Sequence, residues 1–227
     1  MPLAGGRIDR LIAVVPPPYT GPMRDLILER LGGAGLALSL ADAERLAAFL
    51  ELLERWNRVH NLTAITDPEQ MVRRHLSESL ALRGFLRGSR IADVGSGAGL
   101  PGIPLAIAEP EKEFTLIESR AKRARFLSHV KGALDLRNVT IEHCRVEDLR
   151  GMAPFDTVLA RAVAALPELL GLTEHLLGSD SVLLVLTKAD IGPAASAVDK
   201  RYIVRRLDSG VSHLLEGALL AIERAAR

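Results

Sequence analysis

Two kinds of hydrophobic spacing follow one another along the chain, and they change near residue 89. Between residues 23 and 88, apolar side chains recur every three or four positions, which predicts amphipathic helices. The clearest series is Leu46, Phe49, Leu50, Leu53 and Trp56. From residue 90 onward, short apolar runs alternate with longer helical stretches. Short strands separated by helices predict right-handed crossovers, and therefore a parallel, doubly wound α/β sheet.

Capping residues predict where the first helices begin. Ser39 followed by Asp42 resembles a capping box at the start of a long helix. Asp67 is suited to cap a second helix, with Pro68 at its first position and Gln70 reaching back to the cap. That helix is expected to run to about residue 86 and to stop at residue 88, and the stretch 61–67 before it is expected to be a loop.

The second half of the chain contains the predicted strands. The five parallel ones are expected at 90–94, 113–118, 138–143, 155–160 and 181–187. Two further runs, 201–207 and 217–224, are joined by a short glycine-containing connection. They predict a final antiparallel pair at the edge of the sheet.

Composition limits the class of protein. The 227 residues fit one domain with a sizeable extension, and 48% hydrophobic with 25% charged residues is ordinary for a packed protein. With a net charge of +1, any nucleic acid must be bound by local patches. The single cysteine, Cys144, excludes an internal disulfide and a thiolate metal cluster and favours a reducing cytosol. No group of side chains has metal-ligand spacing, so no metal is expected.

The first residues form an apolar run that is too short for a signal peptide or a membrane span. The run 11–15 is only five residues long and is closed by three prolines. We therefore expect residues 1–22 to be a poorly ordered leader, with Met23 as an alternative start, and we expect no membrane association.

The glycine-rich loop after the first predicted strand is the most informative motif. Gly95, Gly97 and Gly99 alternate directly after that strand, and ligands of doubly wound sheets bind beyond the carboxyl ends of the strands. The dinucleotide fingerprint G-x-G-x-x-G, read from Gly95, would require a glycine at the position of Leu100. A literal match at 97–102 starts two residues late and contains a proline.

Asp93 changes which ligand the loop favours. Its carboxylate at the tip of the strand would repel the pyrophosphate of a dinucleotide but attract the ammonium and sulfonium of S-adenosylmethionine. Bare glycine backbone also lets the methionyl group lie close. The residues therefore favour S-adenosylmethionine, with a dinucleotide site or a plain strand-to-helix turn as alternatives.

Acidic and apolar residues follow the next two strands. Glu118 ends the second strand and is suited to accept both ribose hydroxyls of an adenosine, although a helix cap is an equal alternative. Val146 and Glu147 follow the third strand, where they are suited to the face and the polar edge of an adenine. For Glu147, a solvated loop position is the alternative.

Positive side chains follow the fourth and fifth strands. Arg161 is expected beside the presented methyl group, where its planar fork would orient a base edge or a phosphate, and Lys188 would add a second positive charge. Exposed side chains at strand ends are the alternative for both. We take Arg161 and Lys188 as candidate catalytic positioning residues.

Two helical segments supply candidate RNA contacts. In the stretch 118–131, Lys122, Arg123 and Arg125 form a local basic excess suited to phosphates, although a solvated helix surface is the usual interpretation. His75 and Ser79 lie four residues apart on one helical face. For His75, a buried and hydrogen-bonded histidine is the more common alternative.

Six segments together resemble the bacterial small-subunit ribosomal RNA guanine-N7 methyltransferases of the RsmG family, also called GidB. They are "WNRVHNLTAIT" (56–66), "RHLSES" (74–79), "IADVGSGAGLPGIPLAI" (91–107), "ESRAKRARFL" (118–127), "CRVEDL" (144–149) and "ARAVA" (160–164). The resemblance covers about residues 36–190. It departs from the family at Glu78, where Asp is usual, at Ala189, where Gly is usual, and in the tail after residue 190.

The resemblance implies a cytoplasmic enzyme with a Rossmann-like methyltransferase fold that uses S-adenosylmethionine to methylate N7 of a guanine in 16S rRNA. We expect a leader over 1–22, a helical extension over 23–88, a methyltransferase domain over 89–227, and a monomer that acts on the small ribosomal subunit. The cofactor contacts that it implies are Gly95, Leu100, Glu118, Ser119, Arg120, Val146, Glu147 and Arg161.

The resemblance also suits the absence of an evident general base, because guanine N7 carries a lone pair and no proton. Catalysis would then rest on holding the reacting atoms in line. A small-molecule methyltransferase and a non-catalytic RNA-binding module remain the alternatives.

Overall fold

The structure is a computed structural model, and it describes residues 21–161, 165–188, 198–208 and 215–225. The expected leader falls mostly on residues 1–20, outside the described residues. Helix α1 (Pro22–Gly33) already begins at Pro22, so the boundary expected after residue 22 lies inside its first turn.

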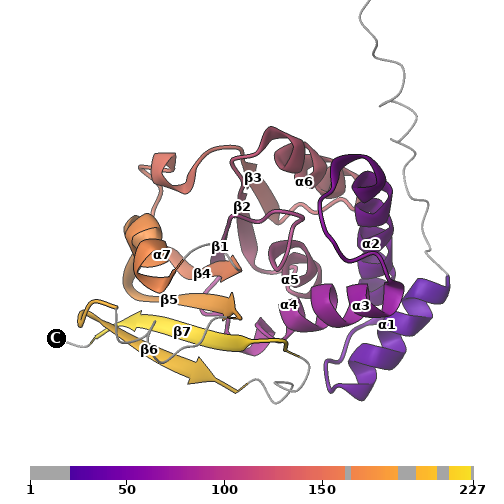
Figure 1. Ribbon diagram of the computed structural model, residues 1–227, viewed down its shortest axis with the longest axis horizontal. Helices are drawn as coiled ribbons and strands as arrows, with labels where there is room; N and C mark the ends of the chain where they lie inside the picture. The colour runs from indigo at the N-terminus through magenta and orange to yellow at the C-terminus, as the bar shows by residue number, and fades with distance from the viewer. Residues whose placement is uncertain (1–20, 162–164, 189–197, 209–214, 226–227) are drawn as a thin grey trace, which may run out of the picture.

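A seven-stranded sheet forms the centre of the molecule, in the order β3-β2-β1-β4-β5-β7-β6 (Figure 1). Its strands are β1 (Arg90–Val94), β2 (Glu113–Ile117), β3 (Val139–Glu142), β4 (Phe155–Arg161), β5 (Leu177–Thr187), β6 (Tyr202–Leu207) and β7 (Ala218–Arg224). Strand β7 runs antiparallel to both β5 and β6, and the other paired strands described are parallel. The sequence prediction of a parallel sheet with a final antiparallel pair is confirmed.

Strand β5 is longer than the sequence predicts. It begins at Leu177, four residues before the expected start, and its pairing with β4 shifts between Phe155 and Thr157. The early part of the strand contains the polar run 178–181, where Ser181 Oγ accepts the Gly178 N–H and donates to the Phe155 carbonyl. Because this irregular, polar start has no alternation of hydrophobic and polar residues, the sequence pattern does not predict it as part of a strand.

Helices cover both faces of the sheet. Helices α2 (Leu40–His60), α5 (Gly102–Ala108) and α6 (Ala121–Ala133) lie on one face, and α7 (Leu166–Thr173) lies on the other (Figure 1). One short 3-10 turn, η4 (Val146–Asp148), lies between β3 and β4, and another, η5 (Glu174–Leu176), lies between α7 and β5. The two faces bury two separate clusters of apolar side chains.

The predicted cap residues are confirmed, but the helix that follows Asp67 is not regular. Ser39 Oγ accepts the Asp42 N–H at 3.1 Å, and Asp67 Oδ1 accepts the Gln70 N–H at 2.9 Å. Gln70 does not reach back, because its side-chain oxygen accepts from Arg73 instead.

The expected single helix over about 68–86 is wrong in detail. It consists of α3 (Pro68–Met71), the π-helical segment η2 (Val72–Ser77), α4 (Glu78–Leu80) and the 3-10 turn η3 (Arg83–Phe85). A π turn places one extra residue in each hydrogen-bonded ring, so the 3.6-residue period used in the sequence analysis does not detect it.

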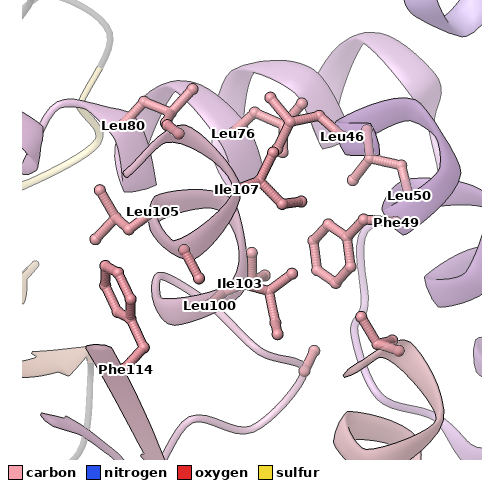
Figure 2. Packing of buried hydrophobic residues seen from close by; sticks show 14 of the residues in the cluster. Leu46, Phe49, Leu50, Leu76, Leu80, Leu100, Ile103, Leu105, Ile107 and Phe114 are labelled. Carbon is pink, nitrogen blue, oxygen red and sulfur yellow. The ribbon is translucent and has the colours of Figure 1, made fainter. Parts of the chain in front are cut away.

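The helices that precede the first strand bury their apolar side chains in the same hydrophobic core as one face of the sheet. Leu46, Phe49 and Leu50 of α2 point toward Ile103 and Ile107 of α5, with Leu76, Leu80, Leu100, Leu105 and Phe114 around them (Figure 2). All ten side chains are at most 8% exposed. The helical region over 23–88 is therefore packed onto α5, the helix that directly follows the glycine-rich loop.

Candidate active site

The carboxyl ends of β1 and β4 lie side by side at the centre of the sheet, where the strand order reverses direction. β1 pairs with β2 on one side and with β4 on the other, and the chain leaves it toward β2. Such a switch point is where ligands of doubly wound sheets bind. It brings together the glycine-rich loop after β1 and Arg161 at the end of β4.

The glycine-rich loop has a backbone that only glycine adopts without strain. Gly95, Gly97 and Gly99 have φ values of 68°, 58° and 82°. At Gly99 a Cβ would lie 2.6 Å from Ile103 Cγ1, whereas at Gly97 the nearest atom would be 3.7 Å away. Gly99 is thus required for packing under the loop, whereas a Cβ at Gly97 would make only ordinary van der Waals contacts.

Asp93 lies beneath this loop, as the sequence predicts, and it is 1% exposed. Its Oδ2 accepts the Gly102 N–H at 3.0 Å and so anchors the far end of the loop. Its Oδ1 has no hydrogen-bond partner in the described part of the chain. Burial raises the pKa of Asp93 to about 7, and the hydrogen bond from Gly102 lowers it only in part. A buried carboxylate oxygen without a partner indicates a position for a ligand group.

Glu118 connects the loop to the start of α6. Its Oε2 accepts the Gly97 N–H at 2.9 Å and its Oε1 accepts the Arg120 N–H at 2.8 Å. Arg123 Nη1 lies 3.9 Å from Oε2. Glu118 is not the N-cap residue of α6, which is Arg120, but it binds the backbone N–H of that residue, so the alternative of a helix cap is met in part. Each carboxylate oxygen has a further lone pair, which keeps the predicted contact with ribose hydroxyls chemically open.

The other predicted cofactor contacts lie around the same edge. Leu100 and Val146 are buried, and the Val146 carbonyl lies 3.1 Å from His175 Nε2. Ser119, Arg120 and Glu147 are exposed. Their contacts with a cofactor stay predictions.

Arg161 is not the exposed strand-end residue of the alternative interpretation. Its Nη2 donates to Glu78 Oε2 at 2.9 Å and to the Arg74 carbonyl at 3.2 Å. Its Nη1 is buried without a partner among the described atoms. Burial lowers the pKa of Arg161, while the nearby Glu78 and Asp93 oppose that effect. A guanidinium at this depth stays charged and keeps one donor for a ligand.

An ion-pair network that the sequence did not predict surrounds Arg161. Glu78 Oε1 also lies 3.0 Å from Arg74 Nε, and Glu216 forms ion pairs with Arg73, Arg74 and Lys188. The spacing of four residues between Arg74 and Glu78 was a usable signal for one of these pairs. Glu216 gave none, because it is 138 residues from Glu78 in the chain.

Lys188 is the exposed member of this network. Its Nζ lies 3.0 Å from Glu216 Oε2, and its side chain is 66% exposed. The structure therefore agrees with the solvated position given as its alternative and also places it beside Arg161, along the same rim.

His75 and Ser79 do not lie at the surface, so the expectation that they contact RNA is not compatible with this structure. His75 is 3% exposed and Ser79 is fully buried. Ser79 Oγ donates to the His75 carbonyl at 2.5 Å, and Ser77 Oγ donates to the Val72 carbonyl at 3.3 Å. These hydroxyls satisfy carbonyls of the π-helical segment, which explains the serines of "RHLSES".

The "WNRVHNLT" segment has a matching structural role. Asn61 ends α2 in the left-handed conformation with φ of 50°, and Asn57 Oδ1 accepts the Thr63 N–H. Thr63 Oγ1 then lies 3.1 Å from His75 Nε2. These contacts hold the loop after α2 against the π-helical segment.

Replacing His75 by glutamine is expected to flatten the acid side of the stability profile. Burial, with Arg161 and Arg74 nearby, lowers the pKa of His75 to about 4 from 6.5. Between these two pH values the His75 side chain is protonated in the unfolded chain but neutral in the folded chain. The free energy of unfolding therefore falls as the pH drops from about 6.5 to 4. The loss is about 3 kcal/mol at most. Urea unfolding of wild type and H75Q at several pH values measures the difference, and equal slopes for the two proteins would contradict it.

The basic residues of α6 divide between two positions. Lys122 and Arg125 are exposed, whereas Arg123 is half-buried and leans toward Glu118 beside the loop. They therefore do not all share one face. Their contacts with RNA stay predictions.

Two other classes of site have no candidate within the described ranges. No group of three or more His, Cys, Asp or Glu lies close enough to hold a metal ion there. The helices in those ranges are all too short or too polar to cross a bilayer.

Comparisons with known proteins agree with this geometry. The sequence model of the GidB family, described as rRNA small subunit methyltransferase G, matches residues 42–206. Ribosomal RNA small subunit methyltransferase G of Idiomarina loihiensis is 46% identical over 154 residues, which is 68% of this chain and 75% of that protein. The protein of the same name from Saccharophagus degradans is 38% identical over 205 residues, or 90% and 92% of the two chains.

A solved structure is similar in fold alone. The crystal structure of a methyltransferase from Geobacter sulfurreducens covers 94% of this chain and 100% of its own, with a TM-score of 0.58 and 13% identity. Its likeness concerns the arrangement of strands and helices, in agreement with the Rossmann-like methyltransferase fold that the sequence predicts.

Proposed function

The chain belongs to the GidB family of rRNA small subunit methyltransferases G, and from this premise we propose that it methylates N7 of a guanine in 16S rRNA with S-adenosylmethionine as the methyl donor. One observation supports this function most strongly. A carboxylate oxygen of Asp93 and a guanidinium nitrogen of Arg161, both buried and both without a partner in the described ranges, flank the glycine-rich loop.

These residues fit the proposed cofactor. S-adenosylmethionine carries an amino-acid group with both charges, so a buried anion and a buried cation at one site match it. Asp93 would hold a positive group of the cofactor, and Arg161 would hold its carboxylate. Glu118 would accept the ribose hydroxyls, while the glycine backbone admits the methionyl chain. When bound, the cofactor supplies a methyl group on a positively charged sulfur.

The chain's own residues then act by positioning. Guanine N7 presents a lone pair and needs no general base, so no side chain has to take a proton from it. His75, whose pKa is lowered to about 4, stays neutral and buried behind the site. Holding two reactants in line is worth about 7–11 kcal/mol of a barrier. Arg161, at the end of β4, would position the methyl donor through the carboxylate of the cofactor, and Lys188, directly after β5, is suited to orient the base or a phosphate.

The partner follows from the same proposal. The exposed Lys122 and Arg125 of α6 lie on the helix that begins next to the glycine-rich loop, where they would contact RNA phosphates. We propose that the chain acts on the small ribosomal subunit, in the cytoplasm and as a monomer. The three regions 1–22, 23–88 and 89–227 remain our proposed division of the chain.

Methyl transfer to small ribosomal subunits tests this function. The purified protein is incubated with S-adenosylmethionine and 30S subunits from a strain that lacks its gene, and the modified nucleotide is mapped by mass spectrometry. We expect one 7-methylguanosine in 16S rRNA, and no further transfer to subunits from the parent strain. Transfer to another atom, or none to subunits or to free rRNA despite measurable cofactor binding, would refute the proposal.

A further inference from the structure

A cavity opens at the carboxyl ends of β4 and β5, on the side of Arg161 away from the glycine-rich loop. Its volume is about 310 Å³. Among its walls are Arg74 and Glu78 from the broken helix, Arg161 from β4, Lys188 after β5, and Glu216 before β7. Pockets for small ligands span about 300–1,000 Å³, so this one is of a size for a single base.

Arg161 joins this cavity to the cofactor loop. It lines the cavity and also interacts electrostatically with Asp93 beneath the loop. A base in the cavity would therefore lie next to the position where the methyl group is presented. To enter, the base would have to leave its stack in the RNA.

Lys188 and Glu216 present a donor beside an acceptor on the rim of the cavity, 3.0 Å apart. Glu216 Oε2 accepts a hydrogen bond from Lys188 and forms an ion pair with Arg74. Among the described residues, Oε1 accepts only from Arg73, so Oε1 keeps a free lone pair. The cations, Lys188 first, lower the pKa of Glu216, so the acceptor is ionised at neutral pH.

Glu78 is not available for this task, although it lines the same cavity. Its side chain is 8% exposed, and its two oxygens are bound by Arg161 and Arg74. The Glu216 side chain, in contrast, is 34% exposed. Glu78 thus holds the arginines in place, and Glu216 is the carboxylate that an entering base meets.

We propose that this cavity receives the acceptor guanine and that Lys188 and Glu216 select it, an inference that rests on the proposed function. Beyond N7, the edge of guanine presents O6, then N1–H, then the 2-amino group. Lys188 would donate to O6, and the free lone pair of Glu216 Oε1 would accept from the 2-amino group. Adenine has its 6-amino donor where guanine has O6, and an unprotonated N1 acceptor where guanine has N1–H. Adenine cannot flip to reverse this pattern, because its N7 must face the methyl group.

Removal of the 2-amino group from the base tests the role of Glu216. The substrates are 30S subunits reconstituted with 16S rRNA that carries either guanosine or inosine at the mapped target; inosine keeps N7, O6 and N1–H. For the wild-type protein we expect kcat/KM on inosine to be on the order of 10- to 100-fold lower, as for the loss of a hydrogen bond to a charged group. For E216A we expect a lower rate on guanosine and a guanosine-to-inosine ratio near 1.

Glu174 provides the matched control. It is 37% exposed, is paired with Arg201 and Arg224, and does not line the cavity. E174A should keep the wild-type ratio, and both variants should bind S-adenosylhomocysteine as the wild type does. A wild-type ratio in E216A would overturn the assignment of Glu216. A wild-type protein that binds the cofactor but methylates neither substrate would instead refute the proposed function, and the inference with it.

Discussion

Replacing Asp93 by asparagine is expected to weaken binding of S-adenosylmethionine by about 100-fold, while the folded protein becomes more stable. The carboxylate is 1% exposed, with one oxygen on the Gly102 N–H and the other without a partner in the described structure. A charged hydrogen bond to the cofactor is worth about 1.5–3 kcal/mol. Asparagine can still accept from Gly102 but offers no charge to a cationic ligand.

The pH dependence of D93N follows from the same burial. The pKa of Asp93 is about 7 in the folded chain and 3.8 in the unfolded chain, so the folded state holds more protons between these values. The free energy of unfolding therefore falls as the pH rises from about 4 to 7, by roughly 2–4 kcal/mol. The variant lacks this fall and should be the more stable protein at pH 8.

Calorimetric titration and urea unfolding measure both effects. Cofactor affinity of the wild type should rise between pH 6 and 8 as Asp93 loses its proton, and that of D93N should change less. Asp156 is the matched control, since its carboxylate also accepts backbone N–H groups, from Ser89 and Arg90, but at the opposite end of the sheet. D156N should bind the cofactor normally. Equal affinities of D93N and wild type would remove Asp93 from the site.

Replacing Gly99 by alanine is expected to destabilise the protein by about 4 kcal/mol and to abolish cofactor binding. A non-glycine residue at φ of 82° costs about 1–3 kcal/mol, and overpacking adds about 1–3 kcal/mol. The overpacking arises because the added Cβ would lie 2.6 Å from Ile103 Cγ1 and 3.1 Å from Leu127 Cδ2. Relief requires movement of the loop, which would carry Gly97 away from Glu118.

A substitution at Gly97 distinguishes backbone strain from overpacking as the cause of the destabilisation. Its φ of 58° is also positive, but a Cβ there meets nothing closer than 3.7 Å. G97A should therefore lose only the backbone contribution, about 1–3 kcal/mol. Denaturant midpoints of the two variants give the comparison. If G97A and G99A unfold at the same midpoint, the packing argument under the loop is wrong.

The features that the sequence predicts correctly depend on local pattern and on the geometry of parallel sheets. The strands after residue 90 have strong hydrophobic runs, and the carboxyl ends of parallel strands meet at one edge. For that reason the sequence alone places Asp93, Glu118 and Arg161 at a common edge, and the strand order agrees with that placement.

The features that escape prediction depend on long-range contacts or on irregular backbone. The pairing of β5 with β7 brings Glu216 to Lys188 and, across the rim, to Arg74, and no local pattern encodes that approach. The burial of His75 depends on the π-helical segment, which a regular period does not detect. The unusual Ala189 lies outside the described residues.

The π-helical segment also has a consequence for how this part of the chain can change in evolution. An α-helix advances by about 100° per residue. Met71 and Val72 face the apolar interior before the wide turn, and Glu78 faces Arg161 after it. In a regular α-helix one extra residue would rotate these two faces against each other by that angle, and the wide turn over 72–77 takes up that residue. The chain can therefore hold one more residue here than a regular helix would, while the apolar interior and the arginine both keep their partners; a second insertion would have no such turn to take it up.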